Sequence, residues 1–387
     1  MFVALISALA LVLQTAAADA RGAPESFADL AEKVSPAVVN ITTTTIVEAS
    51  TNTMPMVPEG SPFEDFFKDF MDRGQGGSNG NSVPRRSNAL GSGFVISEDG
   101  YIVTNNHVIE GADEIEIEFF EGFKLPATLV GTDPNTDIAV LKVDSDKPLK
   151  FVNFGDSDTS RMGDWVMAMG NPLGQGFSIS AGIVSQRGRA LQGAYDDYIQ
   201  TDAAINRGNS GGPLFNMDGD VIGVNTAILS PNGGSIGIGF SMASNVVSRV
   251  TDQLIEFGET RRGWLGVKIQ NVTEDIAESK GMENASGALI SDVPEGPSKE
   301  AGIEAGDVII TFDGKNVEDA NALVRTVGET EVGKAVRVIV LRDGKTKTGD
   351  PWSSRRSGKH SLPRSRRATT CAQRHQHVRP NIDAALR

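Results

Sequence analysis

The spacing of hydrophobic and polar residues predicts a chain built mostly of short β-strands. Two short apolar segments, at 94–97 and 101–104, flank the turn residues 98–100 and are typical of a hairpin. Many short strands joined by glycine-rich turns, with few helices between them, favour closed antiparallel barrels. The other strands predicted in this part of the chain are 37–45, 115–119, 138–143, 165–169, 177–186, 198–201, 221–228 and 236–241.

Toward the C-terminus the pattern changes twice. Residues 244–257 place apolar side chains at helical spacing, which predicts a helix that closes the barrel domain. After Gly258, strands and helices alternate, which favours a smaller α+β domain at 263–348. Its predicted elements are strands at 264–269, 288–293, 307–312 and 336–341, and helices at 274–280 and 320–327. The chain is therefore expected to be mainly β, with barrels in residues 21–258 and one α+β domain after them.

The first 20 residues have the pattern of a signal peptide. The apolar run at 2–13 is too short to span a bilayer, and Ala18 and Ala20 have the spacing of a signal-peptidase site. We therefore expect export, with a mature chain that begins near Arg21. No Lys or Arg precedes the run, so a buried N-terminal helix is the alternative. A short amphipathic helix is predicted next, at 26–34.

A long irregular segment, residues 47–89, interrupts the barrel domain. It is rich in Gly, Pro, Ser and Asn, and it contains an aromatic patch at 63–70. A loop of this length inside a domain is usually functional or disordered. The aromatic patch is compatible with two roles for this segment, docking on a neighbouring molecule or a mobile insertion.

Charge separates the end of the chain from the rest. The formal net charge is −14, yet residues 351–387 carry eight Arg and one Lys against one Asp. The preceding part is therefore strongly acidic, which argues against nucleic acid as its partner. The tail at 349–387 has no hydrophobic periodicity, and we expect no strand after residue 348. It is either a basic arm that binds nucleic acid or a membrane surface, or it is the product of a translated frameshift.

One glycine-rich segment has the composition of a nucleophile loop: Gly208-Asn209-Ser210-Gly211-Gly212-Pro213. Glycines let a substrate approach closely and allow backbone N–H groups to face a developing oxyanion. An ordinary Gly-Ser turn is the alternative. Because Pro213 follows at once, the segment is not the strand-turn-helix elbow of other serine hydrolases.

A serine hydroxyl needs an adjacent base before it can attack. His107 is the only histidine before residue 360, and it follows a predicted strand. Asp137 precedes an apolar strand, which suits the partly buried acid that accepts from an imidazole; Asp133, in a turn before a proline, is the nearest rival. The order His107, Asp137, Ser210 is the order found in chymotrypsin.

Other chemistries have little support. Cys371 is the only cysteine, so neither a disulfide framework nor a cysteine metal site is expected. The sequence contains no dinucleotide fingerprint and no phosphate-loop lysine. We therefore predict no cofactor and no metal.

With these motifs, the chain resembles the HtrA (DegP/DegQ-like) family of exported serine endoproteases. The resemblance implies a chymotrypsin-like double β-barrel with the active site between the barrels. It implies that His107 is the general base, that Asp137 orients it, and that Ser210 is the nucleophile. Backbone N–H groups of Gly208 and Ser210 would then form the oxyanion hole. The shared stretches run through the barrel domain, at 91–96, 104–108, 136–140, 170–172, 200–202, 206–214 and 237–241.

The second domain resembles the PDZ module of the same family. Trp264-Leu265-Gly266-Val267 matches its carboxylate-binding loop, and residues 306–309 match a later strand. Such a loop captures the C-terminal carboxylate of a peptide that adds a strand to a sheet edge. The resemblance further implies a periplasmic location, homotrimers formed near Phe27, and larger assemblies in some members.

The residues before the serine also predict a substrate preference. Ala204 lies six residues before Ser210, where trypsin-like proteases have an acid at the base of the specificity pocket. An apolar, shallow pocket with walls from 203–206 and 225–239 should favour small aliphatic side chains. The residues expected to line it are Ala204, Ile205, Asn206, Ile228 and Ile238.

These features predict an ATP-independent serine endopeptidase for unfolded or damaged exported proteins in the envelope stress response, with chaperone-like activity. Because no ATP-binding motif is present, substrates must arrive unfolded. One alternative is a peptide-binding chaperone with little proteolysis. Another is nucleic-acid binding through the tail.

Overall fold

The computed structural model of this chain describes residues 23–47, 85–171, 176–191, 193–206, 208–230, 234–348, 352–353 and 355–356. The expected signal peptide, most of the loop at 47–89 and most of the tail at 349–387 lie outside the described residues. Within the described part, no helix combines the length and apolarity needed to cross a bilayer.

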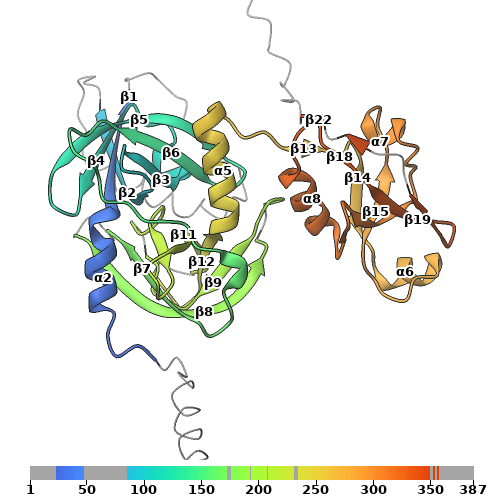
Figure 1. The fold of residues 1–387 in the computed structure, drawn as a ribbon, viewed down its shortest axis with the longest axis horizontal. Coiled ribbons are helices and arrows are strands. Elements are labelled where there is room, and N and C mark those ends of the chain that lie inside the picture. Colours follow the sequence, from blue (N-terminus) through green and yellow to red (C-terminus); the bar gives the residue numbers. More distant parts are fainter. Residues whose placement is uncertain are drawn as a thin grey trace, which may run out of the picture.

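A closed antiparallel barrel of six strands comes first, in the order β1-β2-β3-β6-β5-β4 (Figure 1). Closure gives every strand of the barrel a hydrogen-bonded neighbour on each side. Five of the six side chains of β6 are buried, as the apolar run in the sequence predicts. The strands are β1 (Val38–Val47), β2 (Arg85–Val95), β3 (Tyr101–Asn105), β4 (Glu114–Phe119), β5 (Lys124–Asp133) and β6 (Ile138–Val143).

A second closed barrel of six strands follows, in the order β10-β11-β12-β9-β8-β7. The mainly β, double-barrel fold expected from the sequence is confirmed. The strands are β7 (Trp165–Gly170), β8 (Ser178–Arg189), β9 (Tyr198–Thr201), β10 (Pro213–Phe215), β11 (Val221–Ile228) and β12 (Gly239–Ala243).

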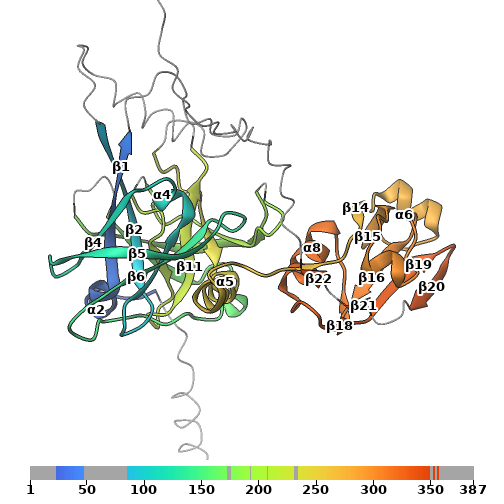
Figure 2. The same cartoon turned by 90° about the horizontal axis from the view of Figure 1, so that it is seen from above.

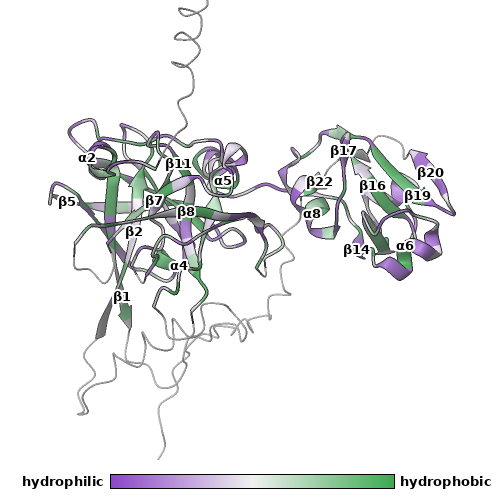
Figure 3. Cartoon of the chain, turned by 90° about the horizontal axis from the view of Figure 1, so that it is seen from below, coloured by the Kyte–Doolittle hydropathy of each residue, from purple (hydrophilic) through white to green (hydrophobic). Residues whose placement is uncertain are grey.

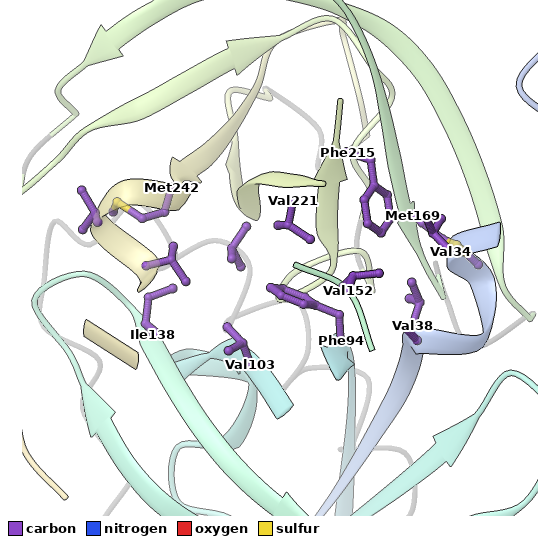
Figure 4. Packing of buried hydrophobic residues seen from close by; sticks show 14 of the residues in the cluster. Val34, Val38, Phe94, Val103, Ile138, Val152, Met169, Phe215, Val221 and Met242 are labelled. Atoms are coloured by element: carbon purple, nitrogen blue, oxygen red, sulfur yellow. The ribbon is translucent and has the colours of Figure 1, made fainter. Parts of the chain in front are cut away.

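The largest cluster of buried apolar side chains lies where the two barrels face each other (Figure 4). Phe94 from β2 and Phe215 from β10 are both fully buried in it. Burying each such side chain stabilises the fold by about 1.5–3 kcal/mol. The barrels therefore share one buried core, which helps a site built from both of them to keep its geometry.

Few helices accompany the barrels. The short helix expected near 26–34 is present as α2, and Val34 at its end is almost fully buried. The amphipathic helix α5 packs its apolar face against both barrels and ends at Gly258, which adopts the left-handed conformation. The helical segments are α2 (Ala28–Val34), η1 (Ser35–Ala37), α4 (Asn106–Ile109), η3 (Ser157–Thr159) and α5 (Ser244–Phe257).

The second domain has its own sheet, in the order β14-β15-β16-β19-β20, and its own apolar core. Its outer strand β20 is exposed and hydrophilic (Figure 3). The strands are β13 (Gly263–Trp264), β14 (Lys268–Asn271), β15 (Ala288–Asp292), β16 (Val308–Phe312), β17 (Lys315–Asn316), β18 (Ala335–Val336), β19 (Val338–Arg342) and β20 (Lys345–Thr348). The helices are α6 (Glu274–Lys280), α7 (Pro297–Glu300) and α8 (Ala320–Glu329).

Two expectations for this domain were wrong. The single strand expected at 264–269 is broken into β13 and β14, because Gly266 adopts a φ of +75° that a strand does not accept. Backbone pairing also continues beyond residue 348, where no strand was expected. Strand β21 (Trp352–Ser353) pairs with β18, and β22 (Arg355–Arg356) pairs with β13.

The linker after α5 joins the two domains through a buried ion pair. Arg262 donates to both carboxylate oxygens of Asp133 at the end of β5, and it stacks on the ring of Tyr195 at 4.4 Å. Helix α8 faces the barrels (Figure 2), where Arg249 of α5 pairs with Glu329 at its end.

Candidate active site

The structure brings His107 and Asp137 into direct contact. His107 lies on the single turn α4, directly after β3, and its Nδ1 is 2.5 Å from Oδ2 of Asp137. The His107 backbone N–H also donates to Oδ1 of the same carboxylate, at 2.9 Å. Because an ionised carboxylate only accepts, this contact places the imidazole proton on Nδ1 and makes Nε2 the basic nitrogen. Such an arrangement suits a general base.

Asp137 is held in an unusual backbone conformation. Its φ of +56° lies in the left-handed region, which is uncommon outside glycine. Its carbonyl oxygen accepts from the side-chain amide of Asn105 at 2.8 Å and from the N–H of Asn106 at 3.0 Å. Strained residues of this kind persist only when their surroundings hold them, and they cluster at functional sites. The bonds to Asn105 and Asn106 thus aim the Asp137 carboxylate at the imidazole.

The loop that carries Ser210 packs against the strands that lead to His107. A Cβ at Gly211, whose φ is +83°, would lie 2.2 Å from both the carbonyl oxygen of Ser92 and the hydroxyl of Thr104. Only glycine fits such a close approach of two backbones. The fit places the loop from the second barrel beside the end of β3 in the first, so residues far apart in sequence share one site.

Some backbone N–H groups of this loop are bonded within the described part of the protein, and others are not. Asn209 donates to the carbonyl of Asn206 at 3.1 Å, and Gly211 donates to that of Asn225 at 2.8 Å. Over the described residues, the N–H groups of Gly208 and Ser210 have no hydrogen-bond acceptor. Two unbonded donors on either side of one bonded N–H are what an oxyanion hole requires. The role of Gly208 and Ser210 in it stays a prediction.

The rival acid, Asp133, has a different partner. It is 1% exposed, and it accepts from Arg262 and from the hydroxyl of Thr136, the latter at 2.6 Å. Burial by itself would raise the pKa of Asp133, but the hydrogen bonds and charge of Arg262 outweigh that effect and hold the pKa below its ordinary value. Asp133 therefore anchors the linker, and Asp137 is the acid that contacts His107.

The residues expected to line the substrate pocket are only partly gathered together. Buried Ile205 and half-buried Ile228 share one apolar cluster inside the second barrel. A Cβ at Gly239 would lie 2.9 Å from Ile205, so the strand β12 closes on that side chain. Ile238 instead packs against the cluster between the barrels.

The remaining two pocket residues lie on the loop itself. Ala204 is exposed, and its carbonyl oxygen accepts from the Ser180 hydroxyl at 2.8 Å. Asn206 accepts from the backbone N–H of Ser235 at 3.0 Å through its side-chain oxygen. The loop before Ser210 is therefore tied to both neighbouring segments, and the role of these residues as pocket walls stays a prediction.

The loop Trp264-Leu265-Gly266-Val267 of the second domain also presents unbonded donors. In the described part of the chain, the backbone N–H groups of Leu265, Gly266 and Val267 have no acceptor. The Leu265 side chain is buried beside α8, and its carbonyl oxygen accepts from the hydroxyl of Ser298. Successive unbonded N–H groups form a concave site for an anion such as a carboxylate.

Two functional candidates were missed by the sequence reasoning, Asn105 and Ser92. Both are fully buried polar residues inside strands, where apolar residues are the rule. A short polar side chain in an otherwise buried strand is a signal in the sequence, but it does not say which distant group the side chain binds. Within the described residues, no group of three or more His, Cys, Asp or Glu side chains is placed to hold a metal.

Comparison with known proteins agrees with this site. Residues 91–224 match the trypsin-like peptidase domain, and residues 234–350 match the PDZ domain. A probable periplasmic serine endoprotease, DegP-like, from Bartonella henselae is 46% identical over 335 residues, covering 83% of this chain and 66% of that protein. The chain thus spans about two thirds of that relative. A protein of the same description from Halomonas elongata is 45% identical over 361 residues, covering 90% of this chain and 75% of the relative.

Solved structures of HtrA-type proteases resemble this chain over most of its length. The HtrA-type protease AlgW with a decapeptide has a TM-score of 0.69 and 37% sequence identity, covering 86% of this chain and 99% of that one. The serine endoprotease from Yersinia pestis has a TM-score of 0.58 and 29% identity, covering 87% and 99%.

Proposed function

The chain belongs to the family of HtrA-type, DegP-like serine endoproteases, and on this premise we propose that it is an ATP-independent endopeptidase for unfolded or damaged exported proteins. The observation that carries the proposal is the 2.5 Å contact between His107 and Asp137, beside a loop in which the N–H groups of Gly208 and Ser210 have no acceptor among the described residues. A site with a base, an orienting acid, a serine and two oxyanion donors has the parts needed for acyl transfer.

In this mechanism, Oγ of Ser210 attacks the scissile carbonyl carbon while Nε2 of His107 takes the hydroxyl proton. The N–H groups of Gly208 and Ser210 donate to the oxyanion of the tetrahedral intermediate. His107 then gives its proton to the leaving amine as the C–N bond breaks, which leaves an acyl-enzyme on Ser210. A water molecule, deprotonated by His107, then attacks the acyl-enzyme, and the carboxylic acid product leaves as Ser210 regains its proton. Asp137 stabilises the imidazolium in both acylation and deacylation.

The direct test compares digestion of casein by the wild type and by Ser210→Ala. Digestion should fall by about 10⁶-fold, because removing the nucleophile removes the acyl-enzyme route. The matched control is Ser145→Ala, a serine on a surface loop whose hydroxyl bonds to the backbone of Lys147 nearby. Casein digestion by Ser210→Ala at the wild-type rate contradicts the proposal. If Ser210→Ala no longer digests casein but still suppresses the aggregation of unfolded substrate proteins, a chaperone activity coexists with proteolysis.

For substrate preference we propose cleavage after small aliphatic residues. The support is the absence of an acid at Ala204 and the apolar cluster that contains Ile205 and Ile228. A peptide library varied at the residue before the cleaved bond should give faster cleavage after Val or Ala than after Lys or Arg. Equal rates for Val and Arg would contradict this preference.

The PDZ domain is proposed to bind the C-termini of substrate peptides. Its carboxylate would lie on the N–H groups of Leu265, Gly266 and Val267, and the peptide would add a strand beside β14. We place the two domains at about 21–258 and from 263 onward.

A homotrimer in the periplasm is the remaining part of the proposal. Near the N-terminus, the rings of Phe27 and Trp165 lie 6.0 Å apart edge to face, and Trp165 is 38% exposed beside more exposed apolar side chains such as Met162. A partner copy would cover this surface. The relatives are described as periplasmic, and residues 1–20 have the pattern of a signal peptide. Sedimentation of the mature chain as a monomer would contradict the trimer.

A further inference from the structure

Ser92 forms an unusually complete set of hydrogen bonds at the back of the nucleophile loop. It lies on β2 of the first barrel and is 0% exposed. Its backbone N–H donates to the carbonyl of Ser210 at 2.9 Å, and its hydroxyl donates to the carbonyl of Gly208 at 2.6 Å. The Ser92 hydroxyl also accepts from the N–H of Asn171 at 2.9 Å, and its own carbonyl accepts from the Thr104 hydroxyl at 2.7 Å.

These bonds act on the peptide groups on either side of the nucleophile. A peptide group is planar, so a fixed carbonyl of one residue also fixes the N–H of the next. The Ser92 hydroxyl thereby holds the Gly208–Asn209 peptide, whose N–H bonds to Asn206 on its other side. The Ser92 N–H likewise holds the Ser210–Gly211 peptide, whose N–H bonds to Asn225.

The peptide between them is held within the loop. The carbonyl of Asn209 accepts from the N–H of Gly212 at 3.0 Å. The loop therefore has no carbonyl between Gly208 and Ser210 that can rotate without breaking a hydrogen bond. Among the described residues, the N–H groups of Gly208 and Ser210 have no acceptor. The Ser210 N–H keeps its direction because it belongs to the Asn209–Ser210 peptide, which is held at its carbonyl. The Gly208 N–H belongs to the preceding peptide, and the Ser92 hydroxyl holds Gly208 through its carbonyl on the other side.

The space around Ser92 admits little other than serine. A Cβ at Gly170 would lie 2.8 Å from the Ser92 hydroxyl oxygen, and a Cβ at Gly212 would lie 3.2 Å from the Ser92 Cβ. A larger side chain would push the nucleophile loop away. Alanine would fit, but it would leave the carbonyl of Gly208 and the N–H of Asn171 buried without this partner. Leaving such groups unsatisfied favours a rearranged loop.

From these contacts we infer that Ser92 is a positioning residue for the oxyanion hole. It acts through the carbonyl groups of Gly208 and Ser210, and it holds the peptides on both sides of the Ser210 N–H so that this group stays available to the substrate carbonyl. The inference deepens the proposed function and rests on it. It also means that the first barrel contributes to both halves of the chemistry, His107 for proton transfer and Ser92 for the hole.

The test is Ser92→Ala, assayed for cleavage of a chromogenic peptide amide and for inhibition by a peptidyl boronic acid that forms a tetrahedral adduct. We expect kcat to fall by about 10–100-fold with KM almost unchanged, because a displaced oxyanion donor costs transition-state binding only. The affinity for the boronic acid should fall in the same proportion as kcat. The affinity for a cleaved product peptide should stay at the wild-type value.

Ser244→Ala is the matched control. Ser244 is also 0% exposed, and its hydroxyl also donates to a glycine carbonyl, that of Gly155, at the same 2.6 Å. It lies at the start of α5, and its hydroxyl bonds to a segment outside the nucleophile loop. Loss of the Ser244 hydroxyl should lower the melting temperature, as Ser92→Ala does, but it should leave kcat within twofold of the wild type. Both variants are assayed well below their melting temperatures.

A kcat of Ser92→Ala within twofold of the wild type, with a lowered melting temperature, would overturn the inference. If alanine prevents folding, Ser92→Cys carries the test, because its thiol is a weak donor of similar size. Ser92→Cys should have a lower kcat than the wild type. If its kcat and its affinity for the boronic acid both equal the wild-type values, the inference is overturned as well. Ser210→Ala is assayed in parallel. Full activity there would contradict the proposed function itself, whereas an unchanged kcat in the Ser92 variants contradicts only the positioning role.

Discussion

In the described part of the chain, the loops at Ser210 and at Trp264 both present backbone N–H groups without an acceptor, and they are held in opposite ways. The nucleophile loop around Ser210 lies between two closed barrels, and its carbonyl groups accept from Ser92 and from within the loop. The carboxylate loop at Trp264–Val267 lies at the open edge of a sheet, where Trp264 is 39% exposed. Its described side-chain anchor is a single hydroxyl, that of Ser298.

This difference follows from what each loop has to bind. An oxyanion hole must already point its donors at a charge that exists only in the transition state, so any reorganisation raises the barrier. A carboxylate loop binds a ground-state anion, and the peptide supplies further contacts as an added strand. Rigid support is therefore concentrated at Ser210, and an accessible edge is found at Trp264.

The largest expected effect comes from Asp137→Asn. The amide offers its N–H₂ toward the imidazole, so His107 takes the wrong tautomer, and kcat should fall by about 10⁴-fold. Binding of a C-terminal peptide to the PDZ domain should not change, because that loop shares no residue with the triad. Asp144→Asn, an acid fully exposed on the surface, is the control and should keep wild-type kcat. Peptide hydrolysis and fluorescence anisotropy measure the two properties, and a large change in peptide affinity would break the separation between the loops.

A second effect of moderate size is expected at the ion pair that joins the two regions. Arg262→Met leaves Asp133 buried and unpaired, and breaking a buried pair in this way typically costs about 3–5 kcal/mol. Thermal unfolding should show this loss for the barrel domain. The exposed pair Arg161–Asp164 supplies the control, since Arg161→Met should change the melting temperature little. Equal effects of the two substitutions would contradict the assignment of Asp133 and Arg262 as an anchor.

The same pair predicts a pH dependence. Arg262 lowers the pKa of Asp133 in the folded chain, so the stability it provides is present above the ordinary carboxyl pKa and is lost as the pH falls through the lowered value. In Arg262→Met, burial should raise the pKa of Asp133 instead. The stability difference between wild type and variant should therefore shrink as the pH falls from neutral toward about 3, and a difference that grows in acid would contradict this.

The smallest expected effect is at the carboxylate loop. Gly266→Ala forces a side chain onto a φ of +75° and places a Cβ 3.2 Å from the Trp264 ring, so peptide affinity should fall by about tenfold. Gly314→Ala is the control, because its φ is +78° but no atom lies within 4 Å of the added Cβ. Both substitutions should cost similar backbone strain, and only the first should weaken binding of a C-terminal peptide. An equal loss of affinity in both would mean that the loop geometry is not what binds the carboxylate.

Much of the fold was readable because it depends on local pattern. The strand 138–143 and the helix 274–280 appear with the bounds that the sequence predicts, since each is a continuous apolar or amphipathic run with clear turn residues around it. The break between β13 and β14 was not readable, because Gly266 is one glycine among many in this chain. The pairing of β21 and β22 was missed for a related reason, since two-residue bridges have no periodicity to detect.

The candidate site also has one part that the sequence predicts and another that it does not. The identities of His107, Asp137 and Ser210, and their order, follow from the sequence because nucleophilic catalysis requires those side chains and few others compete for the roles. The choice of Asp137 over Asp133 agreed with the sequence, but its cause did not appear there. It depends on Arg262, which lies 129 positions away from Asp133 and forms a hydrogen-bonded ion pair with it.

What the sequence determined by itself was the chemistry and the list of parts: a serine, a single histidine, a well-placed acid, and two stretches of backbone rich in glycine. The tertiary structure alone decided how those parts are held. Three features all depend on how two barrels pack: the left-handed backbone of Asp137, the contact of Ser92 with Gly208 across 116 positions, and the N–H groups of Gly208 and Ser210 that have no acceptor among the described residues. Hydrogen bonds between distant residues leave no local pattern in a chain, so their direction exists only once the core between the barrels has formed.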